Sequence, residues 1–242
     1  MAKSSRGGQR GNSGISASSN KVLGKKGDPK TIEEALQNVN KTNYDKARNE
    51  WRDKYDKLHE QYQNGEISKS EFASKYEQLN GGYDINCQRC VWAYELQRRG
   101  YDVEALPNLE GDNPNSLSRG GNWMKLDKNS KGSQRLAEYN YYKQESNKDA
   151  SNNALKMMSE WGDGSRGIIR LARKSGSGHV FNVEYSKGKI IAVDAQTGEK
   201  YTSLWKALTQ NKAVPYTVQL VRTDNAVIDM TQVNKYVKKR GT

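Results

Sequence analysis

The chain has 242 residues, of which only 33% are hydrophobic, and its 40 Lys and Arg against 28 Asp and Glu give a formal net charge of +12. Two cysteines cannot form a disulfide framework for a chain of this length, so we expect its stability to come from an apolar core within one domain shorter than the whole chain. No apolar run approaches the length of a membrane span, and the N-terminus lacks the apolar stretch of a signal peptide, so composition predicts neither a membrane protein nor classical export. A reduced cytosolic compartment is the default.

The excess positive charge is concentrated at the N-terminus. Residues 1–30 contain seven Lys or Arg and one acidic residue, Asp28, among Gly, Ser and Asn. This composition is typical of a disordered basic tail. Such a tail either binds nucleic-acid phosphates without sequence preference or serves for solubility or packaging, and both alternatives stay open.

A helical hairpin is predicted after the tail. A short helix over residues 31–36 ends near residues 38–40, and apolar residues at three- and four-residue steps predict a longer helix over 43–63. Ser68-Lys69-Ser70-Glu71 has the form of a capping box that begins a second helix. The hairpin of residues 41–80 is either a docking surface for a partner or a solvated pair of helices, and we favour the second.

The residue pattern changes in the middle of the chain. Residues 87–99 predict an amphipathic helix that Gly100 ends, and residues 101–106 alternate as in a short edge strand before Pro107. Residues 108–150 are rich in Asn, Ser, Gly and Lys and read as loop with one helix around 133–142. A firmer helix is expected over 151–161, capped by Ser151 or Asn152.

Strands dominate the C-terminal part. Apolar runs or alternation predict strands over residues 166–172, 179–185, 189–194 and 215–221. A final helix over 230–239 is expected after the N-cap candidate Asp229. Helices followed by an antiparallel sheet predict the α+β class.

Both cysteines lie in Asn86-Cys87-Gln88-Arg89-Cys90, at the start of a predicted helix. A thiol at a helix N-terminus meets the positive end of the macrodipole, which favours the thiolate. The Cys-x-x-Cys spacing also occurs in redox and zinc sites, but zinc needs four ligands and a thioredoxin-like motif needs a βαβ context. We therefore expect no metal and no cofactor, and weigh a cysteine nucleophile against two buried structural thiols.

The chain has two histidines, and only His179 heads a predicted strand. If Lys187-Gly188 is a two-residue turn, Ser186 pairs with Lys189, and counting outward places His179 opposite Gln196 and Asp194 opposite Phe181. His179 and Asp194 then share one face as diagonal neighbours within side-chain reach.

This set of residues suits cysteine-dependent acyl transfer. The imidazole accepts the thiol proton, the carboxylate orients the imidazole, and the thiolate attacks a carbonyl carbon. Backbone N–H groups at the helix start are candidates for holding the oxyanion, with the side chains of Asn86 and Gln196 in support. Cys90 is the alternative nucleophile.

Several separated motifs resemble one known family, the papain-fold toxins. They are Ile85 to Leu96 with its continuation to Pro107, Gly164-Ser165-Arg166-Gly167-Ile168, Gly178-His179-Val180-Phe181-Asn182, Asp194-Ala195-Gln196-Thr197-Gly198, and Arg222-Thr223-Asp224-Asn225. The upstream Ala35 to Asn40 also looks familial, which makes residues 41–80 an insertion within a papain-like domain of residues 31–240. The family's usual Pro after the aspartate is replaced by Ala195.

The resemblance implies Cys87 as nucleophile, preferred over Cys90, with His179 as base and Asp194 as orienting acid. Family members are described as glutamine deamidases of bacterial polymorphic toxins and of phage or prophage head-associated proteins. The resemblance therefore implies a toxin or effector that deamidates glutamine of a protein substrate through a thioester. A papain-like protease or a transglutaminase would share that intermediate. An immunity protein or a capsid or portal protein is the implied partner, and the protein is made in the bacterial cytoplasm for packaging in a virion or delivery into a cell. The alternative from another class is a non-enzymatic virion or cargo protein whose tail contacts DNA.

Overall fold

A five-stranded antiparallel sheet forms the centre of the computed structural model, in the order β6-β5-β4-β3-β7. The structure describes residues 23–40, 45–79, 83, 85–108, 124–125, 144–228 and 235–241. The helices are α2 (Ile32–Val39), α3 (Asp45–Gln63), α4 (Lys69–Gln78), α5 (Cys87–Arg98), α7 (Asn147–Trp161) and α8 (Leu204–Gln210), with a 3-10 turn, η4 (Pro215–Thr217). The strands are β1 (Val103–Ala105), β2 (Met124–Lys125), β3 (Arg166–Ala172), β4 (Gly178–Ser186), β5 (Lys189–Asp194), β6 (Glu199–Tyr201), β7 (Gln219–Arg222), β8 (Val227–Ile228) and β9 (Val237–Lys239).

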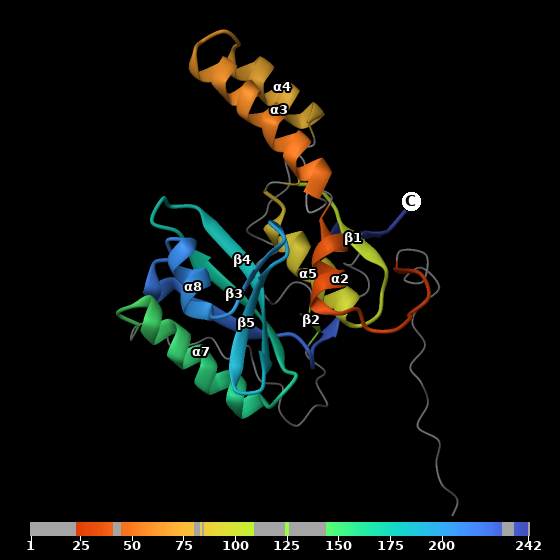
Figure 1. The fold of residues 1–242 in the computed structure, drawn as a ribbon, viewed down its shortest axis with the longest axis vertical. Helices are drawn as coiled ribbons and strands as arrows, with labels where there is room; N and C mark the ends of the chain where they lie inside the picture. Colours follow the sequence, from red (N-terminus) through yellow and green to blue (C-terminus); the bar gives the residue numbers. More distant parts are fainter. Residues whose placement is uncertain are drawn as a thin grey trace, which may run out of the picture.

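Helices cover both faces of the central sheet, with α2 and α5 on one side and α7 and α8 on the other (Figure 1). The core divides accordingly, because alternate residues of a strand point to opposite faces. Val180 of β4 packs in the cluster that contains α2 and α5, whereas Phe181 and Val183 pack with α7 and α8. The predicted α+β fold, with the cysteine helix packed on a C-terminal antiparallel sheet, is confirmed.

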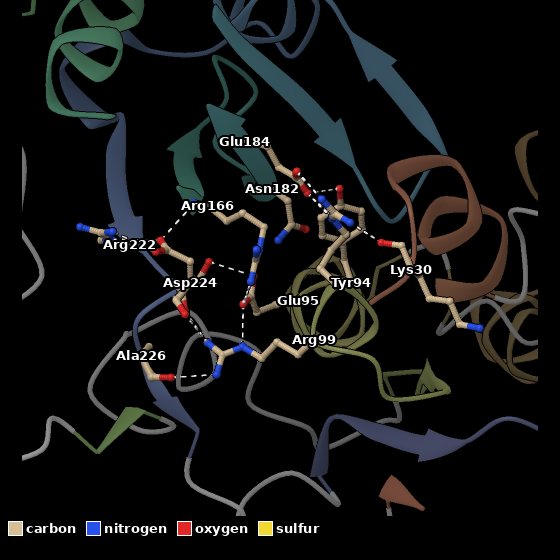
Figure 2. Close-up of polar contacts among 12 residues, drawn as sticks. Lys30, Tyr94, Glu95, Arg99, Arg166, Asn182, Glu184, Arg222, Asp224 and Ala226 are labelled. Atoms are coloured by element: carbon tan, nitrogen blue, oxygen red, sulfur yellow. Dashed lines mark hydrogen bonds and ion pairs between the residues drawn. The ribbon is translucent and has the colours of Figure 1, made fainter. Parts of the chain in front are cut away.

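Buried ion pairs fix the C-terminal half of α5 to the sheet (Figure 2). The Glu95 carboxylate is fully buried and lies 2.7 Å from the Arg99 guanidinium and 2.9 Å from that of Arg166 on β3. Glu184 of β4 accepts hydrogen bonds from Arg98 at 2.7 Å and from the Tyr94 hydroxyl at 2.6 Å. Each buried carboxylate thus has a positive partner, as burial of a charge requires.

The helices α3 and α4 form a hairpin that projects from the rest of the molecule (Figure 1). The Ser68 hydroxyl accepts from the N–H of Glu71, and the Glu71 carboxylate accepts from the N–H of Ser68, so the predicted capping box is confirmed. Between the helices, the Phe72 ring lies 4.9 Å from that of Tyr62, and the Tyr76 ring lies 5.7 Å from that of Tyr55. These aromatic contacts hold the two helices together.

The expected start of α7 at Ser151 or Asn152 is wrong. The helix begins at Asn147 with Ser146 as N-cap, because Ser146 and Asp149 form a capping box that the expected start overlooked. The predicted strand over 215–221 is also shorter: its first part is the turn η4 and only Gln219–Arg222 is strand. β6 and α8 lie in a stretch for which no element was predicted.

The C-terminus is the largest difference from the sequence prediction. Instead of ending a helix, Val237–Lys239 forms β9, which pairs antiparallel with β1; residues 229–234 lie outside the described part. Pairing with a distant strand outweighs the local helical preference that suggested the helix. β1 is the predicted short strand after Gly100, and the helix expected around 133–142 lies outside the described residues.

The packed domain begins before residue 31. Leu23 is 2% exposed and belongs to the core, while the N–H groups of Gly27 and Lys30 donate to the carbonyls of Gly100 and Gln97 at 2.8 and 3.1 Å. Residues 23–30 therefore follow the C-terminal end of α5 and are not part of a disordered tail. No helix in the described ranges has the length and apolar character that crossing a membrane requires.

Candidate functional site

A tight hairpin between β4 and β5 brings His179 and Asp194 together. Lys187 and Gly188 have φ of 50° and 77°, and two successive positive φ values are those of the two-residue turn whose twist matches the strands. Ser186 pairs with Lys189 and Asn182 with Val193, so the predicted register is confirmed over this part of the hairpin.

The imidazole and the carboxylate are in direct contact. His179 Nε2 and Asp194 Oδ2 lie 2.7 Å apart, and the two residues are 3% and 2% exposed. The other carboxylate oxygen of Asp194 accepts from the backbone N–H groups of Gln196 at 3.1 Å and Thr197 at 3.4 Å. These contacts hold the carboxylate in the turn that follows β5, and Ala195 does not open this turn, since the Gly198 N–H still donates to the Asp194 carbonyl at 2.8 Å.

Cys87 completes the group of three. It is the first residue of α5, directly after the N-cap Asn86, and it is half-buried. Its thiol lies close enough to His179 to contribute to raising the pKa of the imidazole. His179 Nε2 contacts the Asp194 carboxylate, which leaves Nδ1 as the ring nitrogen available to the thiol.

The charge state of the imidazole follows from these neighbours. Burial lowers the pKa of His179, but hydrogen bonds to Asp194 and Cys87, together with the negative charges of both groups, outweigh it and raise the pKa from 6.5 to about 9. At neutral pH the imidazole is therefore mostly positively charged beside the Asp194 carboxylate.

Cys90 lies in a different environment. It is fully buried, and its Sγ donates to the Asn86 side-chain oxygen at 3.2 Å. Burial, with the nearby charges of Cys87 and Asp194, raises the pKa of the Cys90 thiol well above its usual value. Cys87, and not Cys90, is thus the thiol that helps to raise the pKa of His179.

The side chain of Asn86 is not placed to hold an oxyanion. Its Nδ2 donates to the Asn40 side-chain oxygen at 3.2 Å and to the Leu106 carbonyl at 2.9 Å. An amide nitrogen has two hydrogens, and both are used in these bonds. The expectation for Asn86 is corrected from oxyanion donor to a structural link at the start of α5.

Gln196 contributes through its main chain. Its N–H donates to Asp194, and its carbonyl accepts from Asn40 Nδ2 at 3.0 Å. It is 8% exposed and follows the turn that holds the carboxylate. A supporting role for its side chain at an oxyanion stays a prediction.

Part of the chain matches a known protein family. Residues 85–199 match the family model described as papain fold toxin 1, glutamine deamidase. This segment of the chain belongs to the papain-fold toxin family. The papain-fold toxin segment contains Cys87, His179 and Asp194, and it leaves out α2 and the α3–α4 hairpin. The chain has no significant match among the curated proteins or the solved structures.

Sequence patterns missed the residues that hold the cysteine segment in place. The Arg89 Nε donates to the Asn108 side-chain oxygen at 2.8 Å, and Asn108 Nδ2 donates to the Ile85 carbonyl at 2.6 Å. Arg89 and Asn108 are buried, whereas Ile85 is 54% exposed beside the cysteine. Such long-range polar contacts leave no periodic signal in a sequence. Within the described ranges, no three or more His, Cys, Asp or Glu side chains group as metal ligands would.

Proposed function

We propose that this protein is a cysteine-dependent enzyme that hydrolyses glutamine side chains of a target protein to glutamate. The observation that carries the proposal is the buried His179 imidazole, which contacts the Asp194 carboxylate at 2.7 Å and whose pKa the nearby Cys87 thiol helps to raise. The family description supports glutamine as the substrate.

In the first half-reaction, the Cys87 thiolate attacks the carboxamide carbon and forms a carbon–sulfur bond. The His179 imidazolium gives its proton to the amide nitrogen, which leaves as ammonia. The product is a thioester between Cys87 and the former glutamine side chain. Asp194 holds the ring and stabilises its positive charge before the proton is transferred.

In the second half-reaction, the neutral imidazole takes a proton from water as the water oxygen attacks the thioester carbon. The carbon–sulfur bond breaks, the glutamate carboxyl group leaves, and the thiolate and imidazolium are restored. The balance is one glutamine side chain and one water converted to glutamate and ammonia.

Both half-reactions develop negative charge on the carbonyl oxygen. The N–H groups of Arg89 and Cys90 turn back to the Asn86 carbonyl at 2.8 and 3.0 Å. The first N–H groups of α5, on Cys87 and Gln88, have no carbonyl of their own helix to bond. We assign the Cys87 N–H to the oxyanion, where the helix dipole also favours negative charge.

Peptide mass spectrometry of a bacterial lysate treated with the full chain tests this function. Wild-type protein is expected to convert specific glutamines to glutamate with release of ammonia. Cys87→Ala is expected to abolish this conversion, whereas Cys90→Ala, the matched control, is expected to retain it. New peptide termini in place of converted glutamines would instead establish a protease.

A further inference from the structure

A buried asparagine outside the family match connects the two halves of the site. Asn40 is the C-cap of α2 and is fully buried. Capping of α2 does not by itself explain why the Asn40 side chain is buried, because a C-cap amide at the surface could form its hydrogen bonds with water. Its side chain instead reaches two segments far away in the sequence.

Each polar atom of the Asn40 side chain has a partner near the site. Nδ2 donates to the carbonyl of Gln196 and to the carbonyl of Tyr83, both at 3.0 Å. Oδ1 accepts from Asn86 Nδ2 at 3.2 Å. The Gln196 N–H donates to the Asp194 carboxylate, and Asn86 directly precedes Cys87.

The Asn40 side chain therefore bridges two segments. One is the turn after β5 that holds the Asp194 carboxylate, which we call the acid turn, and the other is the N-cap Asn86, which directly precedes Cys87. The backbone of the acid turn and the side-chain amide of Asn86 are both hydrogen-bonded to Asn40. These bonds lie in a buried, low-dielectric environment, where a donor or acceptor without its partner costs free energy. We propose that Asn40 is a positioning residue that sets the distance between the Cys87 thiol and the His179–Asp194 pair. This inference rests on the proposed function, since it concerns the same three reacting groups.

The position of Asn40 also gives the α3–α4 hairpin a connection to the site. The hairpin leaves the domain after Asn40 and returns before Tyr83, and the bond from Asn40 to the Tyr83 carbonyl joins these two ends. The residue that precedes the insertion, Asn40, is thus bonded both to the residue near its far end, Tyr83, and to Gln196 in the turn that holds Asp194.

The substitution Asn40→Asp tests the role with little change of shape. It keeps an acceptor for Asn86 but removes both hydrogens and places a carboxylate oxygen against the carbonyls of Gln196 and Tyr83. The matched control is Asn38→Asp on the same helix, where Asn38 donates only to the Glu34 carbonyl of its own helix at 2.7 Å. Asn40→Ser serves as the second variant, because a hydroxyl replaces only part of the bridge and introduces no charge.

The measurement is the rate of Cys87 alkylation by iodoacetamide as a function of pH, in a Cys90→Ala background. Displacement of the reacting groups by about 1 Å costs on the order of 100-fold in rate, so we expect a loss of that order in Asn40→Asp at neutral pH. Its pH profile is expected to move toward that of a free thiol, while Asn38→Asp keeps the profile of the parent. A purely structural role would lower the melting temperature and leave the pH profile of the folded variant unchanged.

A folded Asn40→Asp or Asn40→Ser variant with the parental pH profile overturns the inference; if Asn40→Asp does not fold, the serine variant decides. Titration of the His179 imidazole by NMR gives a second readout, and its pKa is expected to fall in both Asn40 variants and not in Asn38→Asp. A parent protein whose Cys87 reacts like free cysteine would overturn the proposed function instead, and the NMR titration would still decide the role of Asn40.

Discussion

Substitution of Asp194 by Asn gives the sharpest test of the site. The new amide has nearly the same shape, and its oxygen can still accept from the Gln196 N–H. Its nitrogen, however, faces His179 Nε2 as a donor where the carboxylate oxygen was an acceptor. The ring must then carry its hydrogen on Nδ1, toward the thiol, and it can no longer accept the thiol proton.

The magnitude follows from the pKa of His179. Burial lowers this pKa, and the contacts with Asp194 and Cys87 raise it from 6.5 to about 9. A rise of this size corresponds to about 3 kcal/mol in favour of the protonated ring in the folded protein. Because the folded-state pKa is the higher one, this stabilisation is complete below pH 6.5 and is lost as the pH rises through about 9.

In Asp194→Asn the acceptor for the Nε2 hydrogen and its negative charge are gone, while burial and the contribution of Cys87 remain. We expect the pKa of His179 to fall, so that the folded protein favours the protonated ring less. The difference in unfolding free energy between the two proteins is therefore expected to be larger at about pH 6 than at about pH 10, by up to about 3 kcal/mol.

The two assays are urea unfolding at these pH values and NMR titration of the imidazoles. The chain has only two histidines, so His59→Gln identifies the signal of His179. Titration of wild-type His179 near 6.5, or an unchanged pKa in Asp194→Asn, would refute the reasoning, and an unchanged alkylation rate of Cys87 would remove Asp194 from the mechanism.

Three further substitutions, two of them with a matched control, test how the domain is held together, each by urea unfolding. Cys90→Ala is expected to cost about 1 to 2 kcal/mol through the loss of a fully buried sulfur and to leave Cys87 alkylation unchanged; loss of alkylation would contradict the assignment of the nucleophile. Glu95→Gln leaves two guanidinium groups without their buried carboxylate and is expected to cost about 3 kcal/mol of stability. Its control, Asp102→Asn, breaks an exposed ion pair and is expected to cost less than about 1 kcal/mol. Equal costs would exclude the buried ion pairs of Glu95 as stabilising contacts. Gly100→Ala places a Cβ 2.1 Å from the carbonyl oxygen of Gly27, at a φ of +95°. It should cost more stability than Gly162→Ala, which has a similar φ of +93°, free space around the Cβ and an expected cost of about 1 kcal/mol. Similar losses of stability would show that the segment around Gly27 moves to accommodate the methyl group.

Local chemistry made several elements predictable from the sequence. The Ser68 and Glu71 capping box, the end of α5 at Gly100 and the two-residue turn after Ser186 depend on residues adjacent in the chain. The turn also fixed the register, and because side chains alternate with a period of two, the register fixed His179 and Asp194 on one face. Local signals failed at α7, whose cap lies at Ser146, outside the apolar pattern used to find the helix.

The sequence by itself determined the residue types of the site, the helix start that carries Cys87 and the hairpin that pairs His179 with Asp194. Only the tertiary structure decided which cysteine lies near the imidazole, that the Asn86 amide is bonded to Asn40 and Leu106, and that Asn40 joins Asn86 to Gln196. The C-terminal segment likewise became a strand because β1 was available to pair with it. The physical reason is the same in each case: periodicity and capping act over a few residues, whereas a buried hydrogen bond joins whichever donors and acceptors the packed chain brings within about 3 Å.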